Sequence, residues 1–254
     1  MILDQFKLHD RVALVTGASA GLGAAIALAL AEAGAQVACH GNTRSPESTC
    51  DRIRSAGGVA HAISGDLANP ETPKNLIDQT LEHFGRIDIL INNAGTIRRA
   101  PAVDYSDEDW ATVIEVNLSS VFRLSKLAGR QMIEQQSGGK IVNIASLLSF
   151  QGGITVPAYA ASKGGVAQLT KALANEWAKH RINVNAIAPG YMRTDNTAAL
   201  QADETRNRQI LERIPAARWG EPEDLAGAAV FLSSSASDYI NGHVLVVDGG
   251  WMGR

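Results

Sequence analysis

Seven short, mostly apolar runs rich in valine and isoleucine recur along the chain, and segments of helix length separate them. The runs cover residues 11–16, 36–40, 59–64, 87–92, 140–145, 183–187 and 244–247. Because they are continuous rather than alternating, they are typical of strands that are covered on both faces. Strands that alternate with helices form a parallel sheet. The pattern therefore predicts an α/β fold, a doubly wound sheet of seven parallel strands with helices on both faces.

The same alternation predicts a single domain over residues 1–254, because no charge run, repeat or linker interrupts it. Two long helices are expected, at residues 107–136, with Ser106 or Asp107 as N-cap, and at residues 157–180. Residues 194–215 are polar and only weakly helical in pattern. We expect this segment to form a mobile lid over a ligand at the sheet edge.

Composition and charge exclude several classes of partner. Lys and Arg number 23 against 26 Asp and Glu, so the chain lacks the basic surface that binds nucleic acid. Asp4 stands where a secretion signal is basic and then apolar, and the longest uncharged stretch, residues 141–162, is too polar for a membrane span. Cys39 and Cys50 are the only cysteines, which predicts neither disulfides nor a metal site and favours the cytoplasm.

A glycine-rich turn follows the first apolar run. Residues 16–23 read TGASAGLG, with Gly17, Gly21 and Gly23 before a helix expected at residues 24–33. In a doubly wound sheet such a turn brings backbone N–H groups and a helix N-terminus to a pyrophosphate. A turn that merely packs the helix on the strand is the alternative. The context favours a dinucleotide-binding site.

Residues after the second run bear on which nicotinamide coenzyme binds. NAD-binding sheets carry an acid here that accepts hydrogen bonds from the ribose. The chain has Asn42 and Arg44 instead, and a guanidinium at this place suits a 2′-phosphate. This favours NADP(H) and leaves NAD(H) open, since Arg44 is alternatively a solvated surface residue. Asp66, after the third run, either meets adenine or caps a turn.

Tyr159 and Lys163 are four residues apart in an expected helix, so their side chains share one face. Lowering the pKa of a phenol by ~3 units, into the neutral range, requires roughly 4 kcal/mol. An ammonium about 4 Å away supplies on the order of 4 kcal/mol at an effective dielectric constant of about 20. The pair is therefore a candidate for acid–base catalysis on an alcohol or ketone, with an amphipathic surface pair as the alternative.

Two further polar residues complete this candidate catalytic set. Ser146 directly follows the fifth run, at the carboxyl edge where α/β sheets bind ligands, and its hydroxyl either meets a reacting carbonyl oxygen or caps a turn. Asn117 lies inside the long helix, where asparagine is unfavourable. We expect Asn117 to complete a proton relay to Lys163.

The motifs taken in order resemble the short-chain dehydrogenase/reductase family over essentially the whole chain. The motifs are Thr16-Gly17-x-x-x-Gly21-x-Gly23, Asn92-Asn93-Ala94-Gly95, Asn117, Ser146, Tyr159-x-x-x-Lys163 and Pro189-Gly190. The resemblance implies a Rossmann fold, with Tyr159 as acid/base and Lys163 both lowering its pKa and holding the nicotinamide ribose. It implies that Ser146 orients the substrate and that Asn117 positions a relay water. The coenzyme contacts it implies are Gly17, Ser19, Gly21, Leu22, Gly23, Asn42, Arg44, Asp66, Leu67, Asn93, Ala94, Gly95, Tyr159, Lys163, Pro189, Gly190 and Thr194.

A closer resemblance is to the 2-dehydro-3-deoxy-D-gluconate 5-dehydrogenases, also named 2-deoxy-D-gluconate 3-dehydrogenases. It depends on residues 97–99, 148–153, 175–180 and the tail 235–251. It implies hydride transfer between a nicotinamide and a secondary hydroxyl or ketone of a deoxy-ketohexonate, usually with NAD(H), in a homotetramer. The residues at 41–44 favour NADP(H) instead.

Substrate contacts are expected after the fourth run, where Arg98 and Arg99 reach the same edge and one guanidinium can bind a sugar-acid carboxylate in bidentate fashion. Solvated loop arginines or a subunit contact are the alternatives. Trp251 is expected at a subunit interface. Further pocket candidates are Gln151, Met192, Asn196, Arg218 and Trp219.

Two competing functions remain open at this level. A 3-oxoacyl-[acyl-carrier-protein] reductase shares every catalytic residue, and a basic patch beside the site would favour its acidic carrier. A non-catalytic nucleotide-sensing protein would keep the glycine turn without the acid–base pair. Retention of both Tyr159 and Lys163 argues against the sensor.

Overall fold

The computed structural model describes all residues from 1 to 254 and contains one sheet of seven parallel strands. The strand order is β3-β2-β1-β4-β5-β6-β7. The strands are β1 (Val12–Val15), β2 (Gln36–Gly41), β3 (Ala60–Ser64), β4 (Ile89–Asn92), β5 (Gly139–Ile144), β6 (Ile182–Pro189) and β7 (Val244–Val247). The predicted doubly wound sheet is confirmed, and each predicted strand is found within a few residues of its expected bounds.

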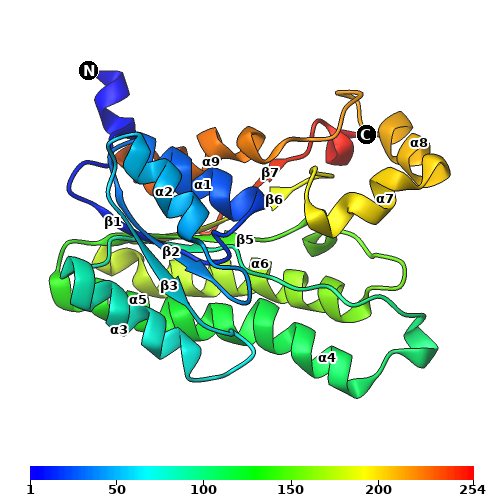
Figure 1. Ribbon diagram of the computed structural model, residues 1–254, viewed down its shortest axis with the longest axis horizontal. Helices are drawn as coiled ribbons and strands as arrows, with labels where there is room; N and C mark the ends of the chain where they lie inside the picture. The colour runs from blue at the N-terminus through cyan, green and yellow to red at the C-terminus, as the bar shows by residue number, and fades with distance from the viewer.

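Helices cover both faces of the sheet (Figure 1). One layer consists of α1 (Gly21–Glu32), α2 (Glu47–Ser55) and α9 (Ala226–Ser233), and the other of α3 (Thr72–Phe84), α5 (Ser120–Gln135) and α6 (Pro157–Trp177). The first layer buries side chains such as Ile26 and Leu232, and the second buries Leu124 and Leu173. The sheet is therefore packed between two apolar cores, in which each fully buried aliphatic side chain contributes about 1.5–3 kcal/mol to stability.

The long helix expected at residues 107–136 contains an irregularity that the pattern did not predict. It is built of α4 (Asp107–Ile114), a π-helical turn over Glu115–Ser119, and α5. Ser106 is the N-cap, because its hydroxyl accepts a hydrogen bond from the Asp109 N–H at 3.1 Å. The π turn contains Asn117, and such turns are frequent at functional sites.

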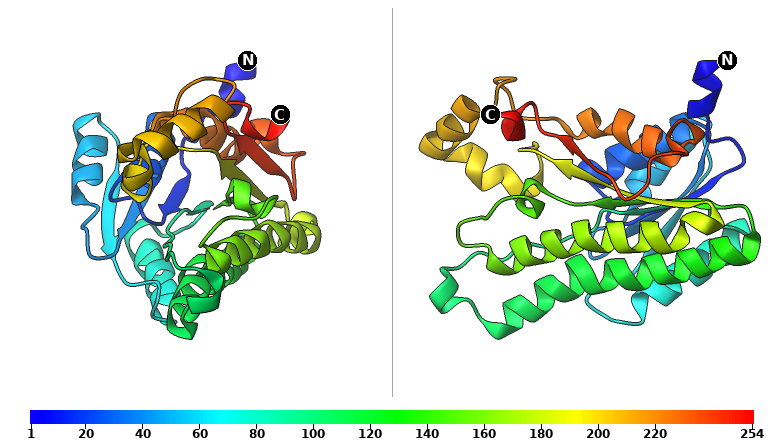
Figure 2. Two further views of the ribbon diagram at one scale, coloured as in Figure 1. Left: turned by 90° about the vertical axis from the view of Figure 1, so that its right-hand side faces the viewer. Right: turned by 180° about the vertical axis from the view of Figure 1, so that it is seen from behind.

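The topology brings several loops to one edge of the sheet. β1 and β4 are neighbours where the strand order reverses, and in open α/β sheets this switch point forms a crevice at the carboxyl ends. The segment expected to be a lid is helical there, with α7 (Ala198–Ala202) and α8 (Glu204–Arg213), and it projects at one end of the molecule (Figures 1 and 2). No helix combines the length and the apolar character needed to cross a bilayer.

Trp251 packs within its own chain, so the expected subunit interface is not needed to explain its burial. Its side chain is 5% exposed. The ring centroid lies 4.6 Å from that of Tyr191, and the Arg213 guanidinium stacks 4.0 Å from the Trp251 ring. The C-terminal turn therefore anchors α8, because an arginine over an indole face forms a favourable cation–π contact.

Candidate active site

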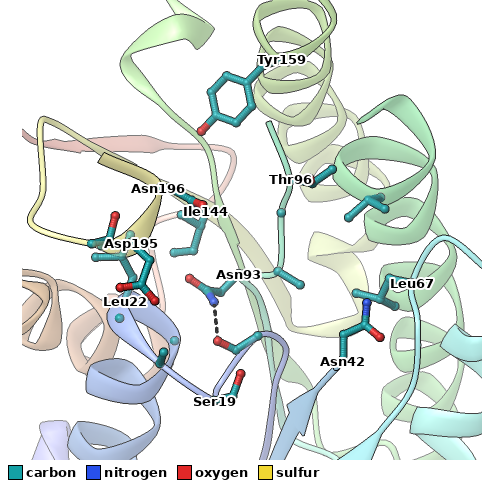
Figure 3. A pocket seen from close by; sticks show the side chains of 18 of the residues that line it. Ser19, Leu22, Asn42, Leu67, Asn93, Thr96, Ile144, Tyr159, Asp195 and Asn196 are labelled. Atoms are coloured by element: carbon teal, nitrogen blue, oxygen red, sulfur yellow. Dashed lines mark hydrogen bonds between the residues drawn. The ribbon is translucent and has the colours of Figure 1, made fainter. Parts of the chain in front are cut away.

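A cavity of about 590 Å³ opens at the carboxyl edge of the sheet. Its walls come from the turn after β1, the end of β2, the loops after β3 to β6, and α6. Every residue predicted to contact the coenzyme lines it, from Gly17 to Thr194. The volume lies within the range of small-molecule and cofactor sites. In Figure 3 the Tyr159 side chain points into this cavity, with Asn93, Ser19 and Asn42 further along it.

The glycine turn is packed so closely against the loop after β4 and against itself that Gly17 and Gly23 have no space for a side chain. Gly17 has φ +66°, and a Cβ there would stand 2.9 Å from Asn93 Nδ2; at Gly23 a Cβ would stand 2.2 Å from the Gly17 oxygen. Asn93 Nδ2 holds the turn by donating to the Thr16 oxygen at 2.8 Å and the Gly17 oxygen at 3.2 Å.

The first helix begins inside this turn, at Gly21 rather than at the expected residue 24, and no side chain caps its N-terminus. Its first N–H groups, with the positive end of the helix dipole, are therefore available to an anion in the cavity. Backbone donors and small residues at this place suit a pyrophosphate, so the site fits a dinucleotide.

The adenosine end of the cavity lacks an acid at the end of β2. Asn42 and Arg44 are exposed in the cavity wall, and the only ion pair of Arg44 is with Asp195, at 3.7 Å. Asp66 caps a turn, as one of its two expected roles required, because its carboxylate accepts the Ala68 N–H at 2.9 Å. It also lines the cavity, and its contact with adenine stays a prediction. The wall therefore presents a guanidinium to this end of the site.

Tyr159 and Ser146 line the same part of the cavity. The Ser146 hydroxyl accepts the Leu148 N–H at 3.2 Å, so the turn-capping role is confirmed, and the same hydroxyl favours a lower pKa of the Tyr159 phenol. Burial raises the pKa of Tyr159 above its ordinary value, and the Ser146 hydroxyl and the Arg99 guanidinium oppose this only in part. Two hydroxyls thus converge on a point where a substrate oxygen can be protonated or deprotonated.

Lys163 is buried, and its ammonium is directed to the strand rather than to the phenol oxygen. Nζ donates to the Ile144 oxygen at 2.6 Å and lies 5.7 Å from the centroid of the Tyr159 ring. Burial lowers the pKa of Lys163 to about 8. In this structure Lys163 is not among the groups that lower the Tyr159 pKa, contrary to expectation, because the Ile144 carbonyl holds the ammonium away from the phenol oxygen.

Asn117 does not line the cavity, and its side chain hydrogen-bonds both the loop after β4 and α6. Its Oδ1 accepts the Thr96 N–H at 2.8 Å, and Nδ2 donates to the Thr96 oxygen at 2.9 Å and to Ser162 Oγ at 3.2 Å. Ser162 Oγ in turn donates to the Tyr159 carbonyl at 2.8 Å. Asn117 therefore ties the loop after β4 to the helix turn that carries Tyr159, and it makes no direct bond to Lys163.

The candidate substrate residues divide into two groups. Arg98, Met192 and Asn196 line the cavity, whereas Arg99 and Gln151 do not. The charge of Arg98 is already paired, because its Nε lies 3.4 Å from the Asp109 carboxylate. Arg99 forms no ion pair; its Nη2 donates to the Asn196 oxygen at 3.4 Å, and its charge acts on the Tyr159 phenol.

The weaker candidates have structural roles instead. Trp219 is 1% exposed and donates to Asn207 Oδ1 at 2.7 Å, and Arg218 pairs with Asp224 at 2.6 Å. Asn92, of the Asn92-Asn93-Ala94-Gly95 motif, does not line the cavity; it is buried, and its Nδ2 donates to Asn143 Oδ1 at 2.8 Å.

His40 was not predicted as a site residue, but it lines the cavity and contacts both Gly17 and Gly65. A polar side chain near the end of a buried strand, just before the coenzyme residues, was the available signal. Thr96 and Ile144 also line the cavity and were not predicted. Ile144 is an apolar residue at the end of β5 and does not stand out from core residues.

Comparisons with known proteins agree with this geometry. A family model described as enoyl-(acyl carrier protein) reductase matches residues 17–252. The chain is 51% identical to 2-dehydro-3-deoxy-D-gluconate 5-dehydrogenase of Dickeya dadantii (strain 3937), over the full length of both proteins.

Two solved structures are similar throughout. One, from Agrobacterium tumefaciens and described as a 2-deoxy-D-gluconate 3-dehydrogenase with NADP bound, is 55% identical with a TM-score of 0.93 over 98% of this chain and 99% of the other. The gluconate 5-dehydrogenase of Burkholderia cenocepacia J2315, in complex with NADP and tartrate, is 40% identical with a TM-score of 0.94 over all of both chains. The chain therefore belongs to the short-chain dehydrogenase/reductase family and is an NAD(P)-dependent oxidoreductase.

Proposed function

We propose that this protein interconverts a secondary hydroxyl and a ketone on a deoxy-ketohexonate, as a 2-dehydro-3-deoxy-D-gluconate 5-dehydrogenase, with NADP(H) preferred. The observation that carries the proposal is the placing of the Tyr159 and Ser146 hydroxyls in one cavity with a dinucleotide-binding turn. The full-length identity of 51% to a relative of that name supports the substrate class.

The glycine turn and Arg44 would hold NADPH, which when bound would supply the hydride for the new C–H bond at the ketone carbon. Tyr159 Oη gives its proton to the ketone oxygen, and Ser146 Oγ hydrogen-bonds the same oxygen and holds it in reach. In oxidation Tyr159 takes the proton back. The pKa raised by burial keeps the phenol protonated, as reduction requires, but makes it a weaker acid until a positive charge is brought closer. Lys163 would leave the Ile144 carbonyl to hold the nicotinamide ribose, which would bring its charge to the phenol.

NADP(H) is favoured over NAD(H) by the charge at the adenosine end. The one ion pair of Arg44, with Asp195 at 3.7 Å, is exposed and therefore weak, and a 2′-phosphate would replace it with charge-assisted hydrogen bonds. No carboxylate at positions 41–44 would repel that phosphate. The similar structures with NADP bound support the same preference.

Arg99 is the better candidate for the substrate carboxylate. Arg98 already forms an ion pair with Asp109, whereas Arg99 forms none, and its positive charge favours a lower pKa of the Tyr159 phenol. A guanidinium that binds a carboxylate there would orient a sugar acid with its ketone near the two hydroxyls. Asn196, whose carbonyl Arg99 contacts, belongs to the segment 194–215, which we propose closes over the substrate as a lid.

We further propose a cytoplasmic homotetramer. Cys39 and Cys50 are both free thiols, which supports a reducing compartment. Trp110 and Phe122 are each 43% exposed on the long helix, and β7 is a half-buried edge strand. Two separate apolar faces suit the two interfaces of a dihedral tetramer, which light scattering after gel filtration would measure.

The test combines a substrate panel with matched arginine variants. Purified enzyme is assayed with both coenzymes against deoxy-ketohexonates, aldonates, neutral ketoses and β-ketoacyl thioesters. Turnover of deoxy-ketohexonates with NADP(H) is expected, and Arg99→Ala should raise KM for the carboxylated substrate much more than Arg98→Ala does. Faster turnover of acyl thioesters would support the carrier-protein reductase instead. Coenzyme binding without any turnover would indicate a nucleotide sensor.

A further inference from the structure

His40, the fifth residue of β2, joins two segments of the coenzyme cavity. Its side chain is 2% exposed. Nδ1 lies 3.3 Å from the Gly17 nitrogen, Nε2 lies 2.9 Å from the Gly65 oxygen, and the His40 carbonyl accepts the Ala18 N–H at 2.7 Å. One residue therefore holds the glycine turn on one side and the segment that leads to Asp66 on the other.

These contacts define the protonation state of the ring. The Gly17 N–H is a donor, so Nδ1 must accept; the Gly65 carbonyl is an acceptor, so Nε2 must carry the proton. The ring is thus neutral and in the Nε2–H tautomer. Because both nitrogens are engaged by protein backbone, neither is left for a hydrogen bond to the coenzyme.

We infer that His40 is a positioning residue for coenzyme binding, which holds the Gly17 turn and the Gly65 segment at their binding distance only while its ring is neutral. A proton added at Nδ1 would face the Gly17 N–H donor, and two donors cannot share a hydrogen bond. The turn would then shift, and Gly17, with φ +66° and Asn93 close by, has little room to adjust.

The surroundings of the ring favour the neutral form. Burial lowers the pKa of His40 below its ordinary value, and the Gly65 hydrogen bond and the Asp66 carboxylate oppose this only in part. The turn after β1 presents backbone groups alone, α2 presents Thr49 and the Cys50 thiol to this part of the core, and Arg44 lies in the same cavity wall. Protonation is therefore expected only in acid, below the ordinary histidine range.

The experiment measures coenzyme affinity against pH for wild type, His40→Gln and His40→Leu. Calorimetric titrations use NADP⁺ and NAD⁺ at about pH 7.5 and about pH 5.5. The Kd of wild type should rise as the pH falls to about 5.5, by less than about tenfold, because the pKa of His40 lies below its ordinary value of 6.5. His40→Gln keeps one donor and one acceptor but does not titrate, so its Kd should be close to wild type at the higher pH and should rise much less in acid.

His40→Leu should bind both coenzymes about tenfold more weakly at either pH, because both backbone contacts are lost. The control is His180→Gln. His180 lies just before β6, at the opposite edge of the sheet, so this variant should behave as wild type. The titration of the 2′-phosphate affects the Kd of wild type and variant equally. The ratio of the two Kd values at each pH therefore removes it. Nitrogen NMR of the coenzyme-free protein should show the Nε2–H tautomer, independently of any binding.

Several results would overturn the inference. A His40→Gln profile that parallels wild type would do so, as would an imidazole observed as the Nδ1–H tautomer. If wild type binds the coenzyme more tightly in acid and His40→Gln does not, the charged ring attracts the phosphates instead. The inference rests on coenzyme binding and not on the substrate, so a wild-type protein that binds neither coenzyme would overturn the proposed function as well.

Discussion

Replacing Lys163 by methionine should stabilise the coenzyme-free protein while removing most of its activity. The pKa of Lys163 falls from 10.5 to about 8 on folding, because burial penalises the ammonium. Each pKa unit corresponds to about 1.4 kcal/mol, so keeping this charge in the fold at pH 7 costs about 3 kcal/mol. Methionine removes that cost, and leaves the Ile144 carbonyl without its donor at a cost of about 1–3 kcal/mol.

The dependence on pH separates these two contributions. The unfolded chain holds its proton up to the ordinary value and the folded chain loses it near pH 8, so the wild type gains stability as the pH rises between the two. At about pH 9.5 the cost of the charge falls to about 1.4 kcal/mol. The advantage of Lys163→Met over wild type should therefore shrink by about 2 kcal/mol, whatever the unpaired carbonyl costs.

Urea unfolding followed by circular dichroism, at one protein concentration and at both pH values, measures this difference. Lys179→Met is the matched control, because Lys179 is exposed and its replacement should have the same effect at both pH values. A stability difference between Lys163→Met and wild type that does not change with pH would refute the reasoning, since the buried charge would then carry no penalty.

Three further changes test the site. Tyr159→Phe should abolish turnover and leave the Kd for NADP⁺ within a few-fold in a fluorescence titration; residual turnover near wild type would exclude Tyr159 as the acid. Arg44→Ala should weaken NADP⁺ by about tenfold and NAD⁺ hardly at all, and equal losses would contradict a 2′-phosphate contact. Gly17→Ala should weaken both coenzymes and destabilise the protein by about 1–2 kcal/mol in urea, because φ is +66° and Asn93 stands 2.9 Å from the added carbon; unchanged binding would mean that the turn is not the phosphate site.

Much of the fold and of the coenzyme site could be predicted from local pattern. Continuous apolar runs determined a parallel sheet, because only strands covered on both faces lack polar alternation. A parallel sheet brings all strand ends to one edge, so residues such as Gly17, Asn93 and Pro189 were expected near one another before any distance was known. All of the predicted coenzyme residues line one cavity for this reason.

Only the tertiary structure decided which partner each side chain takes. Lys163 donates to the Ile144 carbonyl, Asp109 neutralises Arg98 while Arg99 stays unpaired, and Asn117 sits in a π turn that no spacing rule predicted. Apolar periodicity shows which residues face the core, because the need to bury apolar side chains repeats regularly along a whole strand or helix. Hydrogen bonds and ion pairs instead depend on a few tenths of an ångström between segments far apart in the chain, and those distances exist only once the whole sheet is packed.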